Sequence, residues 1–192
     1  MSGAARLVLV KHSAPTILPS VPAPSWHLSP TGISRCAALA ERLRPFEARS
    51  IASSVEPKAV ETATLVGERL GLTVDLVEGL HEHDRRDSTL LGGDEFERAM
   101  RSLFAHPHDL VFGQETADRA LGRFDAAIGH LLAAHGPGED LIVVSHGTVI
   151  SLFVAAHTGE DGFALWSRLA LPSLVVLRRA DLSLERVEAT LS

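Results

Sequence analysis

RLVLVKHSAP, residues 6–15, passes abruptly from an apolar run to a polar cluster. The apolar run is short and partly β-branched, as expected for a strand buried in the middle of a sheet. Lys11, His12 and Ser13 follow the run directly, so they stand at its carboxyl end. Ligand sites of parallel α/β sheets form at that end. This stretch therefore predicts a first strand, Arg6–Val10, together with part of a site.

Working outward from this stretch, strands alternate with amphipathic helices. The order β-α-β-α-β, two more helices, β-α and a final pair of strands predicts an α/β fold with three layers, α/β/α, around a largely parallel central sheet. We expect one domain over residues 1–192, with a small cap-like insertion around residues 80–114. The predicted strands are Arg6–Val10, Ser50–Ser53, Thr73–Val77 and Asp140–Val144, with a terminal hairpin of Ser173–Leu177 and Leu184–Val187; the predicted helices are Pro30–Arg44, Pro57–Leu70, Glu95–Phe104, Thr116–His135 and Thr148–His157.

Composition narrows the class of protein. The chain has 192 residues, 45% of them hydrophobic and 22% charged, which is too apolar for a disordered protein. Its net charge of −6 provides no general attraction for nucleic acid, so an anion must be bound locally. The single cysteine, Cys36, cannot form an intrachain disulfide and is expected to be a buried thiol. We find no signal peptide or membrane span and expect a cytoplasmic protein that does not bind membranes.

Polar side chains recur where the predicted parallel strands end. Because the carboxyl ends of parallel strands meet at one edge of the sheet, these side chains are expected to gather there. The helices that begin near Pro57 and Thr148 direct unpaired N–H groups at the same edge, which favours phosphate or another compact anion. The residues are Lys11, His12 and Ser13 after the first strand, Ser53, Ser54 and Lys58 after the second, and Ser145, His146 and Gly147 after the fourth.

Several of these residues also have an ordinary structural explanation. A lone histidine after a strand is most often a surface or capping residue, Gly147 suits a tight turn, and Ser53 and Ser54 suit helix capping. Two histidines at equivalent strand ends fit that explanation less well. Lys58 stands in a first helical turn, where a cation is disfavoured, so an anion is expected to compensate for its charge.

Five motifs occur in an order typical of a known family: KHSAPT (11–16), SSVEPKAVETA (53–63), LHEHD (80–84), FGQET (112–116) and VVSHGTVI (143–150). In these motifs the chain resembles the histidine phosphatase superfamily, in the branch related to cofactor-dependent phosphoglycerate mutases, from Leu7 to about Phe153. The resemblance implies a phosphoglycerate mutase-like fold, with His12 as the phosphorylated nucleophile and His146 as a second histidine that touches the phosphoryl group. It also implies that Glu82 is the acid/base carboxylate, with Glu78 as the alternative.

Three residues depart from the family's pattern. Lys11 and Lys58 stand where the family has phosphate-binding arginines, and Ser13 replaces a glycine. Lysine keeps the charge but lacks the bidentate fork of arginine. We expect Lys11, Lys58, Ser13 and Gly147 to bind the phosphate, and we hypothesise that Arg85 or Arg86 restores guanidinium contacts.

The function predicted from these residues is metal-independent hydrolysis of a small phosphomonoester through a phosphohistidine on His12, with no cofactor. One alternative is a catalytically weak or inactive phosphate-binding module, suggested by the two lysines. Another is a phosphoglycerate mutase-type phosphotransferase. A metal-dependent hydrolase is a further rival, because two segments are rich in potential ligands: His81, Glu82, His83 and Asp84, and then His106, His108 and Asp109.

The segment Leu80–Gln114 is expected to shape the substrate pocket, with Trp26 and Trp166 as residues that either line it or pack in the core. Glu115 and Thr116 are expected near the site, and Thr116 also suits the cap of the long helix. The terminal hairpin offers an edge strand, so a homodimer is one assembly that the sequence allows. The apolar candidates within the pocket segment are Phe96, Met100, Phe104 and Phe112.

Overall fold

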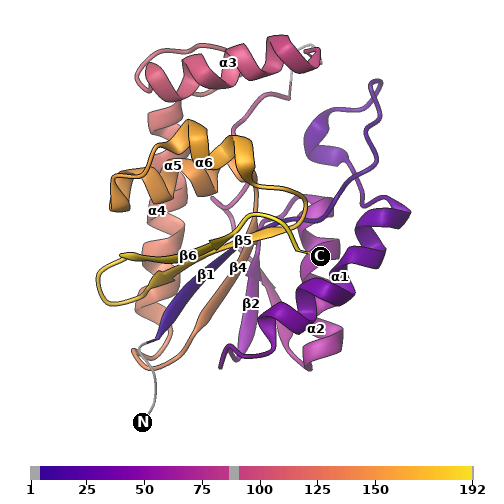
Figure 1. Ribbon diagram of the computed structural model, residues 1–192, viewed down its shortest axis with the longest axis vertical. Coiled ribbons are helices and arrows are strands. Elements are labelled where there is room, and N and C mark those ends of the chain that lie inside the picture. Colours follow the sequence, from indigo (N-terminus) through magenta and orange to yellow (C-terminus); the bar gives the residue numbers. More distant parts are fainter. Residues whose placement is uncertain (1–4, 87–90, 192) are drawn as a thin grey trace.

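In a computed structural model, residues 5–86 and 91–191 form a six-stranded sheet flanked by helices (Figure 1). The strand order is β3-β2-β4-β1-β5-β6. β1, β2, β3 and β4 run parallel to one another, while β5 is antiparallel to β1 and β6 is antiparallel to β5. The strands are β1 Arg6–Lys11, β2 Ser50–Ser53, β3 Thr73–Leu76, β4 Leu141–Ser145, β5 Ser173–Arg178 and β6 Leu184–Glu188.

The predicted α/β fold is confirmed, with a parallel part and a terminal antiparallel hairpin in one sheet. The register pairs Lys11 with Ser145 across β1 and β4, and Ser53 with Val144 across β2 and β4. The carboxyl ends of these three strands therefore lie level with one another, which brings the polar residues after them to one edge.

Helices cover both faces of the sheet, as Figure 1 shows with α1 and α2 on one side and α4 and α5 on the other. Helix α3 packs against α6 and lies beyond the carboxyl end of the sheet, at the top of the view. The helices are α1 Pro30–Leu43, α2 Pro57–Leu70, α3 Gly93–Ala105, α4 Ala117–Ala134, α5 Gly147–Thr158 and α6 Gly162–Arg168, with a short 3-10 turn, η1, at Ala23–Ser25.

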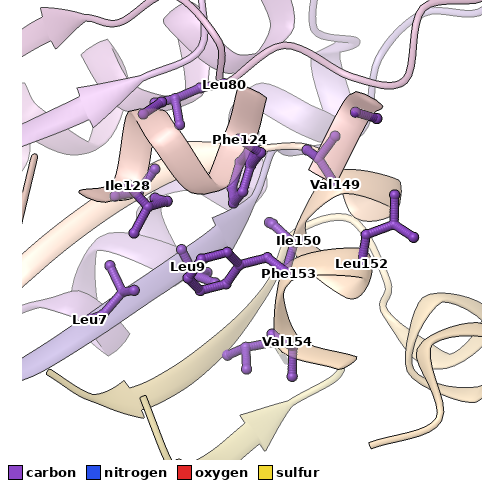
Figure 2. Close-up of a cluster of buried hydrophobic side chains, with 14 of the residues drawn as sticks. Leu7, Leu9, Leu80, Phe124, Ile128, Val149, Ile150, Leu152, Phe153 and Val154 are labelled. Carbon is purple, nitrogen blue, oxygen red and sulfur yellow. The ribbon is translucent and has the colours of Figure 1, made fainter. Parts of the chain in front are cut away.

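Alternation along β1 divides the core in two. Leu7 and Leu9 point toward the face that α4 and α5 cover, whereas Val8 and Val10 point toward α1 and α2. All four are fully buried, so every residue of the run contributes to one layer or the other. Figure 2 shows the first of these layers, where Phe124 of α4 and Phe153 of α5 pack with their ring centroids 5.6 Å apart.

The helix boundaries follow from local chemistry. The Ser29 side chain accepts a hydrogen bond from the Gly32 N–H, and Pro30 occupies the first turn of α1. Thr116 caps α4 by accepting from the Arg119 N–H, as predicted. Gly71 ends α2 in the left-handed conformation, with φ of 71°.

Helix α6 was not among the predicted elements, because its seven residues are too short to show helical periodicity. The signal that marks it is Asp161, whose side chain caps the helix by accepting from the Ala164 N–H. Cys36 is a buried free thiol, as expected. Within the described residues, no helix combines the length and apolar character that crossing a membrane requires.

Candidate active site

His12 and His146 lie side by side at the carboxyl ends of β1 and β4, with ring centroids 5.1 Å apart. Nδ1 of His12 is 2.7 Å from the carbonyl oxygen of Ser13. A carbonyl only accepts, so Nδ1 carries the proton and the lone pair of neutral His12 is on Nε2. Nε2 of His146 is 2.8 Å from Oγ of Ser54, and its buried Nδ1 has no partner among the residues that the structure describes.

Both imidazoles are neutral in this environment. Burial lowers the pKa of His12 well below its ordinary value, and His146, Lys58 and Lys11 lower it further. Burial also lowers the pKa of His146 well below its ordinary value, with Lys58 adding to the effect and Glu82 opposing it. Neutral His12 therefore has a free lone pair on Nε2, and neutral His146 carries a proton on only one of its ring nitrogens.

Glu82 is held in place by two backbone groups. Its Oε1 accepts from the His83 N–H at 2.9 Å, and its Oε2 accepts from the Thr148 N–H at 3.3 Å. Burial opposes ionisation of its carboxyl group, but the charge of Arg85 and the two N–H groups outweigh burial and lower its pKa to about 2. Glu82 is therefore a carboxylate at neutral pH.

The two lysines reach the same edge of the sheet. Nζ of Lys11 donates to the Leu169 carbonyl at 2.7 Å. Burial lowers the pKa of Lys11, with Glu82 opposing this effect. Nζ of Lys58 donates to the Ala23 carbonyl at 2.9 Å and forms an ion pair with Glu56. An ammonium group carries three donors, so Lys58 has fewer left for a ligand than Lys11.

Glu56 belongs to the site, although the sequence analysis did not select it. Its Oε2 binds Lys58, and its Oε1 accepts from the Glu82 N–H at 2.8 Å and lies 3.7 Å from Nε2 of His146. The extended conformation favoured before Pro57 places Glu56 ahead of the first turn of α2. The sequence contains one signal for this residue. A cation is disfavoured in a first helical turn, so Lys58 predicts a nearby anion, and Glu56 is that anion.

The two arginines that follow Glu82 have different surroundings. Arg85 lines the cavity beside the histidines, and its guanidinium carbon lies 4.9 Å from the ring centre of Phe96. Its Nη1 is buried without a hydrogen-bond partner in the described part of the chain. Arg86 instead is exposed and binds Asp84 at 2.6 Å. Of the two, Arg85 is therefore the one that lines the cavity of His12, whereas Arg86 lines the adjoining cavity.

Two other predicted phosphate-binding residues have different surroundings. The Ser13 hydroxyl donates to the Gly32 carbonyl at 2.7 Å, and Ser13 is not part of the cavity lining, so its hydroxyl joins β1 to α1. Gly147 does line the cavity, at the start of α5. A Cβ at Gly147 would lie only 3.0 Å from Cε of Lys11, so glycine makes room for the lysine there.

Arg123 of α4 is a second residue that sequence reasoning did not select. Its guanidinium donates to the carbonyls of Gly79, His81 and Glu82 at 2.9, 2.6 and 2.8 Å. It also forms a bidentate pair with Glu115, at 2.5 and 3.2 Å. Arg123 therefore fixes the backbone of the loop that carries Glu82.

Glu115 lies near the site, as expected. Its carboxylate accepts from the Asp84 N–H at 2.8 Å, and its own carbonyl oxygen is 2.8 Å from Nε2 of His83. Burial opposes ionisation of Glu115, but Arg123 and the Asp84 N–H outweigh burial and lower its pKa. Glu115 and Arg123 thus form one buried unit beneath the loop.

The site faces a cavity of about 400 Å³. Trp26, Trp166 and Phe96 line it, whereas Met100 is buried in the core beneath. An adjoining cavity of about 340 Å³ shares Glu56 and Glu82 with the first and contains the alternative carboxylate Glu78. The polar residues that line the first cavity are Lys11, His12, Glu56, Lys58, Glu82, His83 and Arg85.

The segments rich in potential metal ligands have other contacts. Over residues 5–86 and 91–191, no group of three or more His, Cys, Asp or Glu side chains is arranged to hold a metal ion. His108 pairs with Asp118 on the surface, and the ring of His83 packs 5.0 Å from that of Phe112.

Comparison of this chain with models of known protein families identifies its family. The model of the histidine phosphatase superfamily (branch 1) matches residues 22–187. A search of curated proteins gives no match.

Solved structures share the fold over nearly the whole chain. The native structure of a mycobacterial glucosyl-3-phosphoglycerate phosphatase is 21% identical with a TM-score of 0.77, covering 99% of this chain and 100% of that one. Bacillus stearothermophilus YhfR is 24% identical with a TM-score of 0.78, covering 98% of each chain.

Proposed function

This chain belongs to branch 1 of the histidine phosphatase superfamily, and from that premise we propose that it hydrolyses small phosphomonoesters through a phosphohistidine on His12, without a metal ion. One observation carries the proposal. The Ser13 carbonyl accepts a hydrogen bond from Nδ1–H of His12, so the lone pair on Nε2 of a neutral imidazole remains for attack on phosphorus.

In the first step, the lone pair on Nε2 of His12 forms a bond to phosphorus while the bond from phosphorus to the alcohol oxygen breaks. The leaving oxygen needs a proton, and Glu82 is the carboxyl group proposed to deliver it. Because Glu82 is ionised in the free site, with a pKa of about 2, the proton arrives with the substrate. A phosphomonoester monoanion supplies it, and the negative phosphoryl group raises the proton affinity of Glu82.

In the second step, Glu82 accepts a proton from water, and the water oxygen attacks phosphorus. The nitrogen–phosphorus bond breaks, its electron pair returns to Nε2 of neutral His12, and phosphate leaves with the proton from Glu82 as its monoanion, which regenerates the carboxylate. One carboxylate thus serves both half-reactions, which its fixed position between two backbone N–H groups supports.

Charge on the phosphoryl oxygens is stabilised by groups already in position. Lys11, Lys58 and the unpartnered Nη1 of Arg85 supply positive charge, and Nδ1–H of neutral His146 supplies a further donor when Ser54 donates to its Nε2. Preorganised donors of this kind do most of the work of phosphoryl transfer. No metal ion is needed in this scheme.

The test is hydrolysis of 4-nitrophenyl phosphate in excess chelator by the native chain, by His12→Asn and by the control His157→Asn. His157 pairs with Asp125 on the surface, so its substitution controls for loss of a histidine. We expect turnover by the native and His157→Asn chains and none by His12→Asn. Turnover that survives in His12→Asn, or that chelator abolishes, contradicts the proposal.

A phosphate-binding protein without turnover is the second candidate. The ion pair between Glu56 and Lys58 motivates it, because the pair leaves less positive charge to stabilise the transition state of phosphoryl transfer and so argues against turnover. Binding of vanadate or phosphate by a native chain that hydrolyses no phosphomonoester would favour this second candidate.

A further inference from the structure

The cavity beside His12 has walls of two kinds. The polar wall consists of the charged residues and histidines described above. The second wall is apolar. It consists of Pro15, Ile17, Trp26, Phe96, Trp166 and Leu171. We propose that the leaving group of the substrate is an apolar, ring-bearing alcohol or phenol that packs on this apolar wall. The inference rests on the proposed function and names the substrate class of the same site.

The apolar wall is built from segments that are far apart in sequence. Ile17 and Trp26 come from the segment between β1 and α1, Phe96 from α3, and Trp166 from α6. The rings of Phe96 and Trp166 meet edge to face, with centroids 5.7 Å apart. Lys58 ties the first segment to α2 through the Ala23 carbonyl, which keeps this side of the wall beside the polar wall. A ring held here would meet aromatic faces that are already in place.

One of the two indole N–H groups of the apolar wall is occupied by backbone carbonyls. Nε1 of Trp26 donates to the carbonyls of Leu18 and Val21 at 3.2 and 2.9 Å, so its ring presents carbon to the cavity. The hydroxyl groups of a sugar or a glycerate placed against this wall would give up water and find few partners. Burial of unpaired polar groups is costly, so such leaving groups are disfavoured.

The cations of the cavity belong to the polar wall. Lys58 is paired with Glu56, and the charges of Lys11 and Arg85 act on Glu82 at the proposed phosphoryl site. Among the described lining residues these are the cationic side chains, and of them Arg85 also borders the apolar wall, with its guanidinium carbon 4.9 Å from the ring centre of Phe96. Of the described lining residues, Arg85 alone would offer counter-charge at the apolar wall to a second anionic group such as a carboxylate, and the proposed role of Arg85 at the phosphoryl group competes with that contact.

Ile17 extends the apolar wall to the surface. It lines the cavity and is 61% exposed, so most of its apolar surface is in contact with water. A ring that covers it would remove apolar surface from water on both partners. At roughly 25 cal/mol per Å², a ring burying about 80 Å² gains about 30-fold in affinity.

The test compares affinities of two phosphonates that the protein cannot hydrolyse, 2-phenylethylphosphonate and ethylphosphonate, by titration calorimetry of the native chain. We expect the phenyl compound to bind about 30-fold more tightly. Equal affinities, or no binding of either compound, overturn the inference. The result does not depend on turnover, so it remains decisive if the chain hydrolyses nothing.

A second arm uses the matching esters as substrates. We expect kcat/KM to fall from 2-phenylethyl phosphate to ethyl phosphate, and 3-phosphoglycerate to be hydrolysed at least tenfold less efficiently than the phenyl ester. Preference for 3-phosphoglycerate overturns the inference while leaving the proposed hydrolase intact. Preference for phosphoethanolamine overturns it as well, and points to the adjoining cavity with Glu56, Glu78 and Asp84.

A matched pair of variants tests the apolar wall directly. Ile17→Ser removes a lining side chain that is mostly exposed, and Leu18→Ser removes its neighbour, which is 45% exposed and does not line the cavity. We expect Ile17→Ser to lower the ratio of the two phosphonate affinities about 5-fold, for roughly 40 Å² of lost contact. Leu18→Ser should leave the ratio unchanged. The same ratio in both variants contradicts the proposal.

Discussion

Replacing Arg123 with methionine should destabilise the protein and slow turnover together. The guanidinium holds three carbonyl oxygens of the loop at residues 79–82 and the carboxylate of Glu115. Methionine keeps most of the volume and provides none of these donors. The side chains of Arg123 and Glu115 are only 19% and 10% exposed, so the substitution leaves a buried carboxylate without its cation.

Removing one partner of a buried ion pair costs about 3–5 kcal/mol of unfolding free energy. For a chain of this size, about 2–4 °C of melting temperature is lost per kcal/mol, so Arg123→Met should melt roughly 6–20 °C lower. The kcat for an alkyl phosphate should fall as well, because the backbone of Glu82 loses a hydrogen bond of 2.8 Å.

The assay is thermal unfolding followed by circular dichroism, with Arg119→Met as the control, since Arg119 is exposed one turn earlier on α4. Adding Glu115→Gln to Arg123→Met removes the unpaired charge and should recover part of the loss. Equal melting temperatures for Arg123→Met and Arg119→Met would show that the buried pair of Arg123 with Glu115 does not stabilise the fold.

Glu82→Gln should lower kcat for an alkyl phosphate by about 10²–10⁴ and for 4-nitrophenyl phosphate by less, since a good leaving group needs less protonation; equal losses would contradict the acid role. Glu56→Gln should lower the inhibition constant of inorganic phosphate at least tenfold, because two like charges about 6 Å apart repel by roughly 3 kcal/mol at an effective dielectric constant of 20; unchanged or weaker inhibition would show that the Glu56–Lys58 ion pair does not restrain binding. His12 and His146 have a lower pKa folded than unfolded, so the unfolded chain binds more protons below about pH 6.5. Stability to urea should therefore be complete above pH 6.5 and fall toward pH 5, and less steeply in His12→Asn; a rise in stability over that range would contradict the burial of two neutral imidazoles.

Local pattern was enough to predict the positions of His12 and His146, because each follows an apolar strand and parallel strands end at one edge. Glu56 and Arg123 were missed because their roles depend on side-chain directions that no short pattern encodes. Arg123, for example, contacts the Gly79 carbonyl, 44 positions away in the chain. The hydroxyl of Ser13 illustrates the converse, since its place in a motif did not reveal that it binds α1.

Short sequence patterns also could not reveal which residues form the apolar wall. Trp166 stands on a helix too short for periodicity to reveal, and Trp26 follows a segment with no regular structure apart from the turn η1. The sequence contains two tryptophans but does not show whether they line the pocket. The tertiary structure places both in the lining of one cavity.

The most direct test of the account is to trap the phosphorylated enzyme. Glu82→Gln is mixed with 4-nitrophenyl phosphate, quenched in alkali after milliseconds to seconds, and its peptides are analysed by mass spectrometry. The good leaving group lets the first step proceed, while the missing base slows the second. If His12 is the nucleophile and Glu82 the base, we expect an acid-labile phosphoryl group on His12. It should accumulate in Glu82→Gln and decay faster in the native chain. Release of nitrophenol with no phosphorylated peptide, or with the phosphoryl group on another residue, would contradict it.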